Sequence, residues 1–293
     1  MKYTLAVLVA AVALAPANAQ VFSFTRDQMI RFTAANPYDR FPDGRPKVPD
    51  ELLKKMQDLS VEEIWSVLPQ KGYPNQYEGN WQSMHPEKKL IGRVVTVQFM
   101  PMRPDVRDPM NADAKAAGVD RIAAHQRVID SLQPGDVLVV DIYGKIEGGT
   151  LVGDNLATAV YSATGTGLIV DGAIRDMEGI FPIGMPVYTR GNHPSPINYQ
   201  GIMLTGINVP VRIGNATVMP GDVAFGDRGG IYFVPPQFVK EILDKADETH
   251  IHDEWTKAKF MSGKYKSSDI YPTPRDPALK KEYEEYKKKK LGK

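Results

Sequence analysis

Two apolar runs that each end in aspartate stand at the centre of this 293-residue chain, VLVVD at 137–141 and GLIVD at 167–171. Between them lie a glycine-rich connection, Gly144–Gly153, and a helix-like segment, Asn155–Ala163. Apolar runs of strand length separated by a segment of helix length predict a strand–helix–strand unit. The chain is therefore expected to fold as an α/β protein around this unit.

The flanking sequence predicts further strands and helices. Residues 69–88 and 101–116, rich in proline, are predicted as loops, and Val119–Leu132 as a helix before the first run. A series of short strands and one helix are predicted elsewhere, at Leu90–Phe99, Pro186–Thr189, Val209–Ile213, Ala216–Val218, Asp222–Phe225, Ile231–Val234 and Pro236–Glu248. Strands that alternate with helices and then follow one another closely predict a mixed α/β domain, not a regular doubly wound sheet.

Composition excludes several classes of function. Lys and Arg number 36 against 35 Asp and Glu, so no basic surface for nucleic acid is expected. The chain has no cysteine, which excludes disulfides, thiolate metal sites and a cysteine nucleophile. The motifs of P-loop proteins, HExxH metalloproteases, GxSxG hydrolases and dinucleotide-binding proteins are also missing.

The first nineteen residues have the form of a secretory signal peptide. Lys2 precedes an apolar run from Leu5 to Ala15, and Ala17-Asn18-Ala19 is a small-x-small cleavage site. This run is too short for a stable membrane span, and no later stretch is long and apolar enough. We expect an exported protein, periplasmic or secreted, whose mature chain begins at Gln20.

Residues 20–88 are predicted to form a helical and loop-rich arm, with helices beginning after Thr25, at Pro49 and after Ser60. Residues 89–270 are predicted to form the main domain. Residues 271–293 form a charged tail whose lysine run, Lys287–Lys290, is typical of a solvated helix end.

Candidate binding groups follow the two central strands. Gly153-Asp154-Asn155-Leu156 begins a helix, where free backbone N–H groups can hold a carboxylate. After Asp171 comes Gly172-Ala173-Ile174-Arg175-Asp176. Arg175 can bind a carboxylate through two hydrogen bonds, and Asp176 offers an oxygen ligand suited to Mg²⁺. Open sheets place ligands at the carboxyl ends of their strands, although an ordinary Arg-Asp helix start would have the same sequence.

These segments resemble the RraA-like family, which includes class II 4-hydroxy-4-methyl-2-oxoglutarate / 4-carboxy-4-hydroxy-2-oxoadipate aldolases. The resemblance runs through PGDVLVVD (134–141), GDNL (153–156), GLIVDGAIRD (167–176), MPVYTRG (185–191) and VPVRIGNATVMPGDVAFGDRGGIYFVPP (209–236). It implies an α/β fold with a swivelling β/β/α domain, assembled as a homotrimer or hexamer. It also implies a divalent-metal-dependent lyase, using Mg²⁺ or Mn²⁺, that releases pyruvate from a 2-oxo acid and can decarboxylate oxaloacetate.

The resemblance also assigns roles. Arg175 would bind the pyruvyl carboxylate, Asp176 would hold the metal, and the backbone at 153–156 would contact the substrate. Members that act as regulators lack the acidic residue after the arginine, so Asp176 places this chain among the potential enzymes. Glu178 is a further candidate metal ligand. Either Asp141 or a metal-bound water is expected to move the proton.

Three alternatives stay open at this level. Lys145, at a strand exit, could instead be a Schiff-base lysine or a surface partner of Glu147. The chain could be a binding or scaffold protein that holds a carboxylated ligand without turnover. It could also be an exported lyase or hydratase that acts on a sugar-derived acid.

Overall fold

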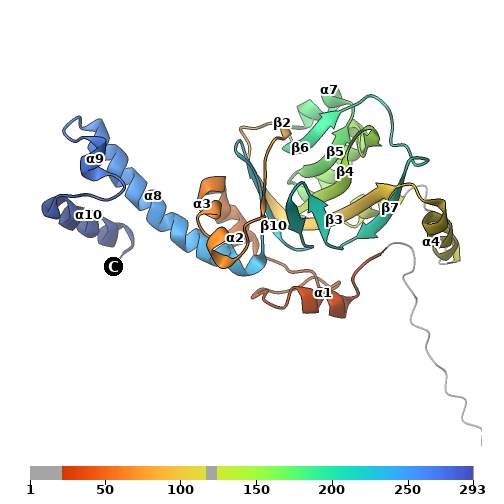
Figure 1. The fold of residues 1–293 in the computed structure, drawn as a ribbon, viewed down its shortest axis with the longest axis horizontal. Coiled ribbons are helices and arrows are strands. Elements are labelled where there is room, and N and C mark those ends of the chain that lie inside the picture. The colour runs from red at the N-terminus through yellow and green to blue at the C-terminus, as the bar shows by residue number, and fades with distance from the viewer. Residues whose placement is uncertain (1–21, 117–123, 293) are drawn as a thin grey trace, which may run out of the picture.

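The computed structural model describes residues 22–116 and 124–292. The predicted signal peptide, residues 1–19, lies outside this range, as does the first part of the helix predicted at 119–132. A mixed nine-stranded sheet forms the centre of the molecule (Figure 1). Its order is β1-β11-β10-β3-β4-β5-β6-β2, and β7 also pairs with β3. These elements confirm the predicted α/β class.

The strands of the sheet are β1 (Tyr77–Glu78), β2 (Gln82–Met84), β3 (Leu90–Pro101), β4 (Asp136–Thr150), β5 (Leu168–Ile174), β6 (Val187–Asn192), β7 (Ile202–Ile207), β10 (Val223–Asp227) and β11 (Gly230–Val234). A separate hairpin consists of β8 (Val211–Ile213) and β9 (Ala216–Val218). The helices are α1 (Arg26–Phe32), α2 (Asp50–Lys55), α3 (Val61–Trp65), α4 (Pro104–Ala116), α5 (Ala124–Asp130), α6 (Asp154–Thr164), α7 (Met177–Ile180), α8 (Val239–Met261), α9 (Ser267–Ile270) and α10 (Pro277–Lys290). Short 3₁₀ turns lie at Met56–Asp58, Pro69–Lys71, Phe181–Ile183 and Pro236–Phe238.

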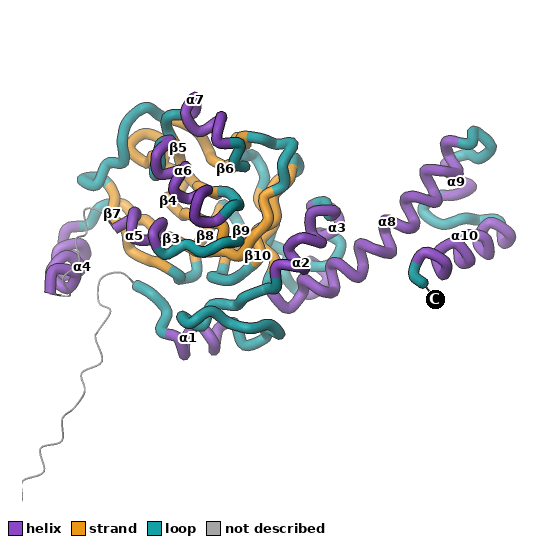
Figure 2. The backbone as a smooth tube through the Cα atoms, turned by 180° about the vertical axis from the view of Figure 1, so that it is seen from behind, coloured by secondary structure: helices purple, strands orange, loops and turns teal. Residues whose placement is uncertain are grey.

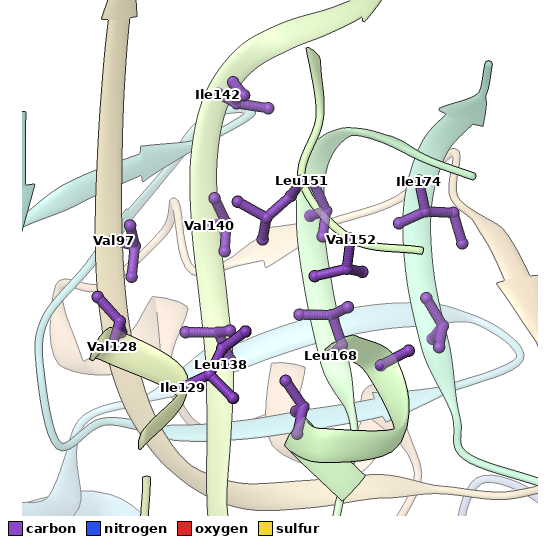
Figure 3. Packing of buried hydrophobic residues seen from close by; sticks show 14 of the residues in the cluster. Val97, Val128, Ile129, Leu138, Val140, Ile142, Leu151, Val152, Leu168 and Ile174 are labelled. Atoms are coloured by element: carbon purple, nitrogen blue, oxygen red, sulfur yellow. The ribbon is translucent and has the colours of Figure 1, made fainter. Parts of the chain in front are cut away.

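The four central strands β3, β4, β5 and β6 are parallel, and their neighbours are antiparallel. A parallel pair needs a crossover connection, and α6 supplies it between β4 and β5. On that face of the sheet, α5 and α6 cover an apolar layer (Figure 2). Figure 3 shows Leu138 and Val140 of β4 beside Leu168 and Ile174 of β5 in this layer. The β8–β9 hairpin packs on the opposite face, over Val137 and Val139.

The arm packs against the sheet at β10 and β11. Apolar side chains of α2 and α3 share a buried cluster with these strands and with the start of α8. Local capping explains where the arm helices begin. Gln28 and Thr25 exchange hydrogen bonds at α1, and the Glu63 carboxylate accepts the N–H of Ser60 at α3. The helix starts predicted at these positions are therefore confirmed.

The C-terminal helices extend away from the sheet. Helix α8 leaves the main body, and α9 and α10 pack at its far end (Figure 1). Trp255 of α8 is buried there beside Tyr283 of α10, and Lys290 pairs with Glu254 at 2.8 Å. No helix among residues 22–116 and 124–292 combines the length and apolar character needed to cross a membrane.

Several predicted element bounds were wrong. Residues 101–116 are mainly a helix, α4, although Pro109 lies inside it; the buried side chains of Met110 and Ala114 anchor it. Most of the predicted glycine-rich connection belongs to β4, whose pairing with β5 shifts register after Asp141 and again after Lys145. The predicted second strand does not end at Asp171 but continues to Ile174. Strand β7 was missed, and α8 is longer than predicted.

Candidate functional site

Arg175 and Asp176 lie directly after β5, at its carboxyl end. The N–H of Arg175 donates to the Val152 carbonyl at 3.1 Å. This hydrogen bond joins the end of β5 to the segment that follows β4. Asp176 has φ 58° and ψ 42°, a left-handed conformation that is uncommon for a residue with a side chain. Such strained backbone often occurs at functional sites. This turn directs both charged side chains out of the end of the sheet.

The start of α6 lies against this turn. A Cβ added at Gly153 would lie 2.1 Å from Asp176 Oδ2 and 3.2 Å from Arg175 Nε. A Cβ added at Gly179 would lie 2.6 Å from Asp154 Oδ2. Each of these glycines therefore makes room for a carboxylate from the opposite segment. The helix start and the Arg-Asp turn fit together only because both positions lack a side chain.

These residues form one wall of a pocket with a volume of about 160 Å³. Its lining is His125, Thr150, Leu151, Val152, Gly153, Asp154, Asn155, Leu156, Arg175, Asp176, Pro196 and Ile197. A second hollow of about 450 Å³ shares Pro196 and Ile197 with it and adds Lys145, Glu147 and Asn198. The two hollows are therefore neighbours on either side of Pro196 and Ile197.

The free hydrogen-bond donors of the pocket suit a carboxylate ligand. Arg175 Nε lies 3.3 Å from Asp176 Oδ2, and the two side chains are 40% and 43% exposed, so this ion pair is weak. The Arg175 side chain makes no other hydrogen bond with the described residues, which leaves guanidinium donors for a ligand. At the start of α6, the N–H groups of Asp154 and Leu156 have no acceptor among the described residues. Donors of this kind at a helix N-terminus bind carboxylates.

His125 adds a titratable group to the pocket. Its Nδ1 is hydrogen-bonded to the hydroxyl of Tyr199. Burial lowers the pKa of His125, so the imidazole is neutral at pH 7. Burial also raises the pKa of Tyr199 to about 12, so that hydroxyl keeps its proton. A neutral imidazole beside an arginine can accept a proton from a bound substrate.

The structure brings together most of the residues predicted for the site. Gly153, Asp154, Asn155 and Leu156 line the same pocket as Arg175 and Asp176. Glu178 is not part of the lining; it is exposed on α7.

Asp141 also lies apart from this pocket. Its side chain points to the face of the sheet covered by the β8–β9 hairpin, where its carboxylate accepts the N–H groups of Tyr143 at 3.0 Å and Arg212 at 3.4 Å. Burial, with a smaller contribution from the neighbouring Asp171 carboxylate, raises the pKa of Asp141. Asp141 is not among the described residues that line the pocket.

The donor set decides what kind of metal site is possible. No group of three or more His, Asp or Glu side chains within the described residues is arranged to enclose a metal ion. The pocket instead offers two carboxylates, those of Asp154 and Asp176. Mg²⁺ is commonly held by one or two carboxylates together with water and substrate oxygens. The pocket therefore fits a divalent ion held in that open manner.

Part of the lining of the pocket at Arg175 comes from segments that no sequence motif marks. His125 is part of no recognisable motif in the sequence, and Pro196 and Ile197 lie in a loop far along the chain from Gly153. Thr150, at the end of β4, holds this loop in place, because its hydroxyl donates a hydrogen bond to the Ser195 carbonyl. Only the fold brings these segments to the end of β5.

Comparison with known proteins identifies the family of the chain. A family model described as RraA-like, Aldolase/RraA, matches residues 58–233. A proposed 4-hydroxy-4-methyl-2-oxoglutarate aldolase of Halalkalibacterium halodurans is 30% identical over 140 residues, 48% of this chain and 65% of that protein. A protein of the same proposed activity from Azotobacter vinelandii is 32% identical over 149 residues, 51% of this chain and 78% of that protein. The chain thus spans slightly less than two thirds of the first relative.

Among solved structures, Streptomyces coelicolor RraAS2 is similar. It is described as an unusual member of the RNase ES inhibitor RraA protein family. It is 28% identical, with a TM-score of 0.59, over 77% of this chain and all of that one. With the family match covering more than half of its length, the chain belongs to the RraA-like family.

Proposed function

We propose that this protein is a divalent-metal-dependent lyase that cleaves a 4-hydroxy-2-oxo acid and releases pyruvate. Decarboxylation of oxaloacetate would be a related activity, because it also leaves negative charge on a 2-oxo acid. The observation that carries the proposal is the meeting of Arg175, Asp176 and the start of α6 in one pocket. The aldolase names of the relatives support the same class of reaction.

The chain's own residues account for substrate binding. The Arg175 guanidinium would hold the carboxylate of the 2-oxo acid through two parallel hydrogen bonds. The free N–H groups of Asp154 and Leu156 would bind the same end of the substrate. Cleavage of the carbon–carbon bond leaves negative charge on the 2-oxo oxygen, and the fixed positive charge of Arg175 would stabilise it.

Asp176 and Asp154 are the residues that would hold Mg²⁺ or Mn²⁺. When bound, such an ion supplies Lewis acidity to the carbonyl and carboxylate oxygens of the substrate. The absence of a side chain at Gly153 leaves room for this carboxylate beside the start of α6.

The reaction also requires a base that accepts the proton of the 4-hydroxyl group. His125 suits this role because its pKa is lowered and it lines the pocket. If its Nδ1–H donates to Tyr199, then Nε2 is unprotonated and can accept that proton. Asp141, the alternative from sequence, contacts the β8–β9 hairpin instead.

A homotrimer or hexamer is part of the proposal. In one chain, the Arg175 and Asp176 side chains are about two-fifths exposed. A reacting site usually excludes water, which strengthens its electrostatic interactions. A neighbouring subunit over this end of the sheet would close the pocket. We also propose that the protein is exported, as the residues before Gln20 indicate.

The test is pyruvate release, coupled to lactate dehydrogenase, from a panel of 4-hydroxy-2-oxo acids, sugar-derived acids and oxaloacetate. Protein treated with EDTA and then supplied with Mg²⁺ or Mn²⁺ should be active only with the metal. Asp176→Ala should abolish turnover without unfolding the protein, since the side chain is partly exposed. Asp247→Ala, an exposed carboxylate on α8, is the matched control and should keep full activity. Full activity in Asp176→Ala would contradict the site assignment.

The similarity to RraAS2 supports a second candidate, a binding or scaffold protein without turnover. It predicts that carboxylated ligands bind at Arg175 but that none in the panel is cleaved. Calorimetry with pyruvate as the ligand, beside the coupled assay, separates the two functions.

A further inference from the structure

Two turns of identical sequence precede strands β4 and β10, Pro134-Gly135-Asp136 and Pro220-Gly221-Asp222. They have the same hydrogen bonds. The N–H of Asp136 donates to Gln133 O at 3.0 Å, and that of Asp222 donates to Met219 O at 3.1 Å. In return, the aspartate Oδ2 accepts the N–H of Gln133 at 3.0 Å or of Met219 at 2.9 Å. Both carboxyl groups are buried, with residue exposures of 0% and 3%.

The arm supplies a cationic partner to the first of these turns but not to the second. Arg45 donates to Asp136 Oδ1 at 2.7 Å and to Oδ2 at 3.1 Å, so this buried carboxylate has a cationic partner. The next residue, Pro46, packs on the second turn, where a Cβ added at Gly221 would lie 2.4 Å from Pro46 Cδ. No ion pair joins Asp222 to any residue in the part of the chain that the structure describes. A buried carboxyl without a cation is therefore left beside the arm.

A pocket of about 380 Å³ opens against Asp222. Arm residues 32–36 and 73–76 form one side of it, and residues 217–222 and 235–237 form the other. None of the described residues that line it is Lys, Arg or His. Both amide hydrogens of Gln76 are used, on Thr217 O and Phe233 O, which leaves its Oε1 as an acceptor. Gln76 Oε1 and the Asp222 carboxyl thus offer acceptors to a ligand that donates hydrogen bonds.

The aromatic side chains of the pocket come from the arm. Phe32 is 56% exposed and Tyr73 is 37% exposed, although both have large apolar surfaces. An aromatic ring attracts an organic cation through its negative face. Pro235 and Pro236 complete the apolar part of the lining. The volume is within the range of sites for small organic ligands.

We propose that this pocket is a second ligand site, one that binds a small organic cation, with an amidinium, guanidinium or ammonium group on an apolar body. Asp222 holds the charged group as Asp136 holds Arg45, and Phe32 and Tyr73 contact the body. The site shares no described lining residue with the pocket at Arg175, and because none of those lining residues is cationic, it is unsuited to a 2-oxo acid. The proposal is therefore independent of the lyase activity.

The ionisation of Asp222 is consistent with this assignment. Burial raises the pKa of Asp222 to about 7, an effect that the hydrogen bond from Met219 only partly opposes. A bound cation would favour the ionised carboxylate and lower its pKa. Tyr73 is the other titratable side chain among the described lining residues.

The experiment uses three probes of nearly the same shape and different charge. Benzamidine is cationic, benzamide is neutral and benzoate is anionic; each is titrated into the full mature protein at pH 8 by isothermal calorimetry. Benzamidine should bind at least 10-fold more tightly than either of the others. Equal binding of the three, or no benzamidine binding at 10 mM, would overturn the proposal.

Variants of the lining residues test whether benzamidine binds in this pocket. Asp222→Asn keeps an oxygen acceptor for the Met219 N–H but removes the charge, so benzamidine binding should weaken at least 10-fold. Phe32→Ala, at an exposed position, should weaken it several-fold without affecting folding. Asp244→Asn on α8, outside the lining, is the control and should bind normally. If Asp222→Asn does not fold, Phe32→Ala decides: unchanged benzamidine binding in that variant would refute the assignment.

Discussion

Replacing Gly153 with alanine would test the arrangement of the candidate site directly. The backbone at Gly153 has φ −105° and ψ −167°, a conformation open to any residue, so the substitution adds no backbone strain. The added methyl group would instead lie 2.1 Å from Asp176 Oδ2. A normal van der Waals contact requires roughly 3.5 Å, so the carboxylate must move by about 1.4 Å.

The magnitude follows from that displacement. A misplacement of about 1 Å at a reacting centre can lower the rate by about 100-fold, or about 3 kcal/mol in the barrier. The effect on stability should be small, about 1 kcal/mol, because the partly exposed Asp176 side chain can rotate away. We therefore expect kcat/KM for pyruvate release to fall by about 100-fold while the protein stays folded.

A second glycine provides the control. A Cβ added at Gly191 would lie 3.0 Å from Ile146 Cδ1, the end of a flexible aliphatic side chain, and not against a charged group. Gly191→Ala should therefore lower the melting temperature slightly and change kcat/KM by less than about threefold. Both variants are measured by the coupled assay and by thermal melting at saturating Mg²⁺. Wild-type kcat/KM in Gly153→Ala would refute the claim that the position of Asp176 matters.

Four further predictions concern the site, the buried acid, the assembly and the processing of the chain. Arg175→Lys should lower kcat/KM by about 100-fold with little change in melting, because an ammonium group cannot make the planar two-point contact; a change below threefold would contradict its role. Burial raises the pKa of Asp222 from its ordinary value of 3.8 to about 7. Its contribution to stability is therefore present below about pH 4 and is lost as pH rises through 7. The free energy of unfolding in urea, measured for Asp222→Asn and for wild type, gives the check. The variant's value minus the wild-type value should increase by about 3 kcal/mol between pH 5 and pH 8. No increase would refute the claim that burial raises the pKa of Asp222. Light scattering at micromolar concentration should give a trimer or hexamer, and a monomer would remove the shared-site proposal. Intact mass of exported protein should correspond to a chain that begins at Gln20, whereas retention of Met1 would exclude cleavage.

The local signals in the sequence predicted much of the fold because they act within a few residues. The Thr25–Gln28 and Ser60–Glu63 caps satisfy backbone groups of the helix that they begin. The central strands are buried on both faces, so each is a continuous apolar run that is visible without tertiary information. The Arg-Asp turn and the start of α6 were recognisable for the same reason, since each site segment is contiguous.

That same burial explains why the sequence does not show which face of the sheet the Asp141 side chain points to. A strand that is apolar on both faces has no alternating pattern, so nothing in VLVVD shows which side chains face α6 and which face the β8–β9 hairpin. Only the pairing of β4 with its neighbours places Asp141 toward Arg212 and away from the pocket.

Contacts between distant segments account for the rest. His125 joins the pocket through Tyr199, 74 residues away in sequence, and Arg45 reaches Asp136 across 91 residues. The sequence by itself determined the α/β class, the family and the two segments that carry the candidate site, Gly153–Leu156 and Arg175-Asp176. Only the tertiary structure decided which charges meet and which of the two Pro-Gly-Asp turns has a cationic partner, because these depend on where the arm packs against the sheet.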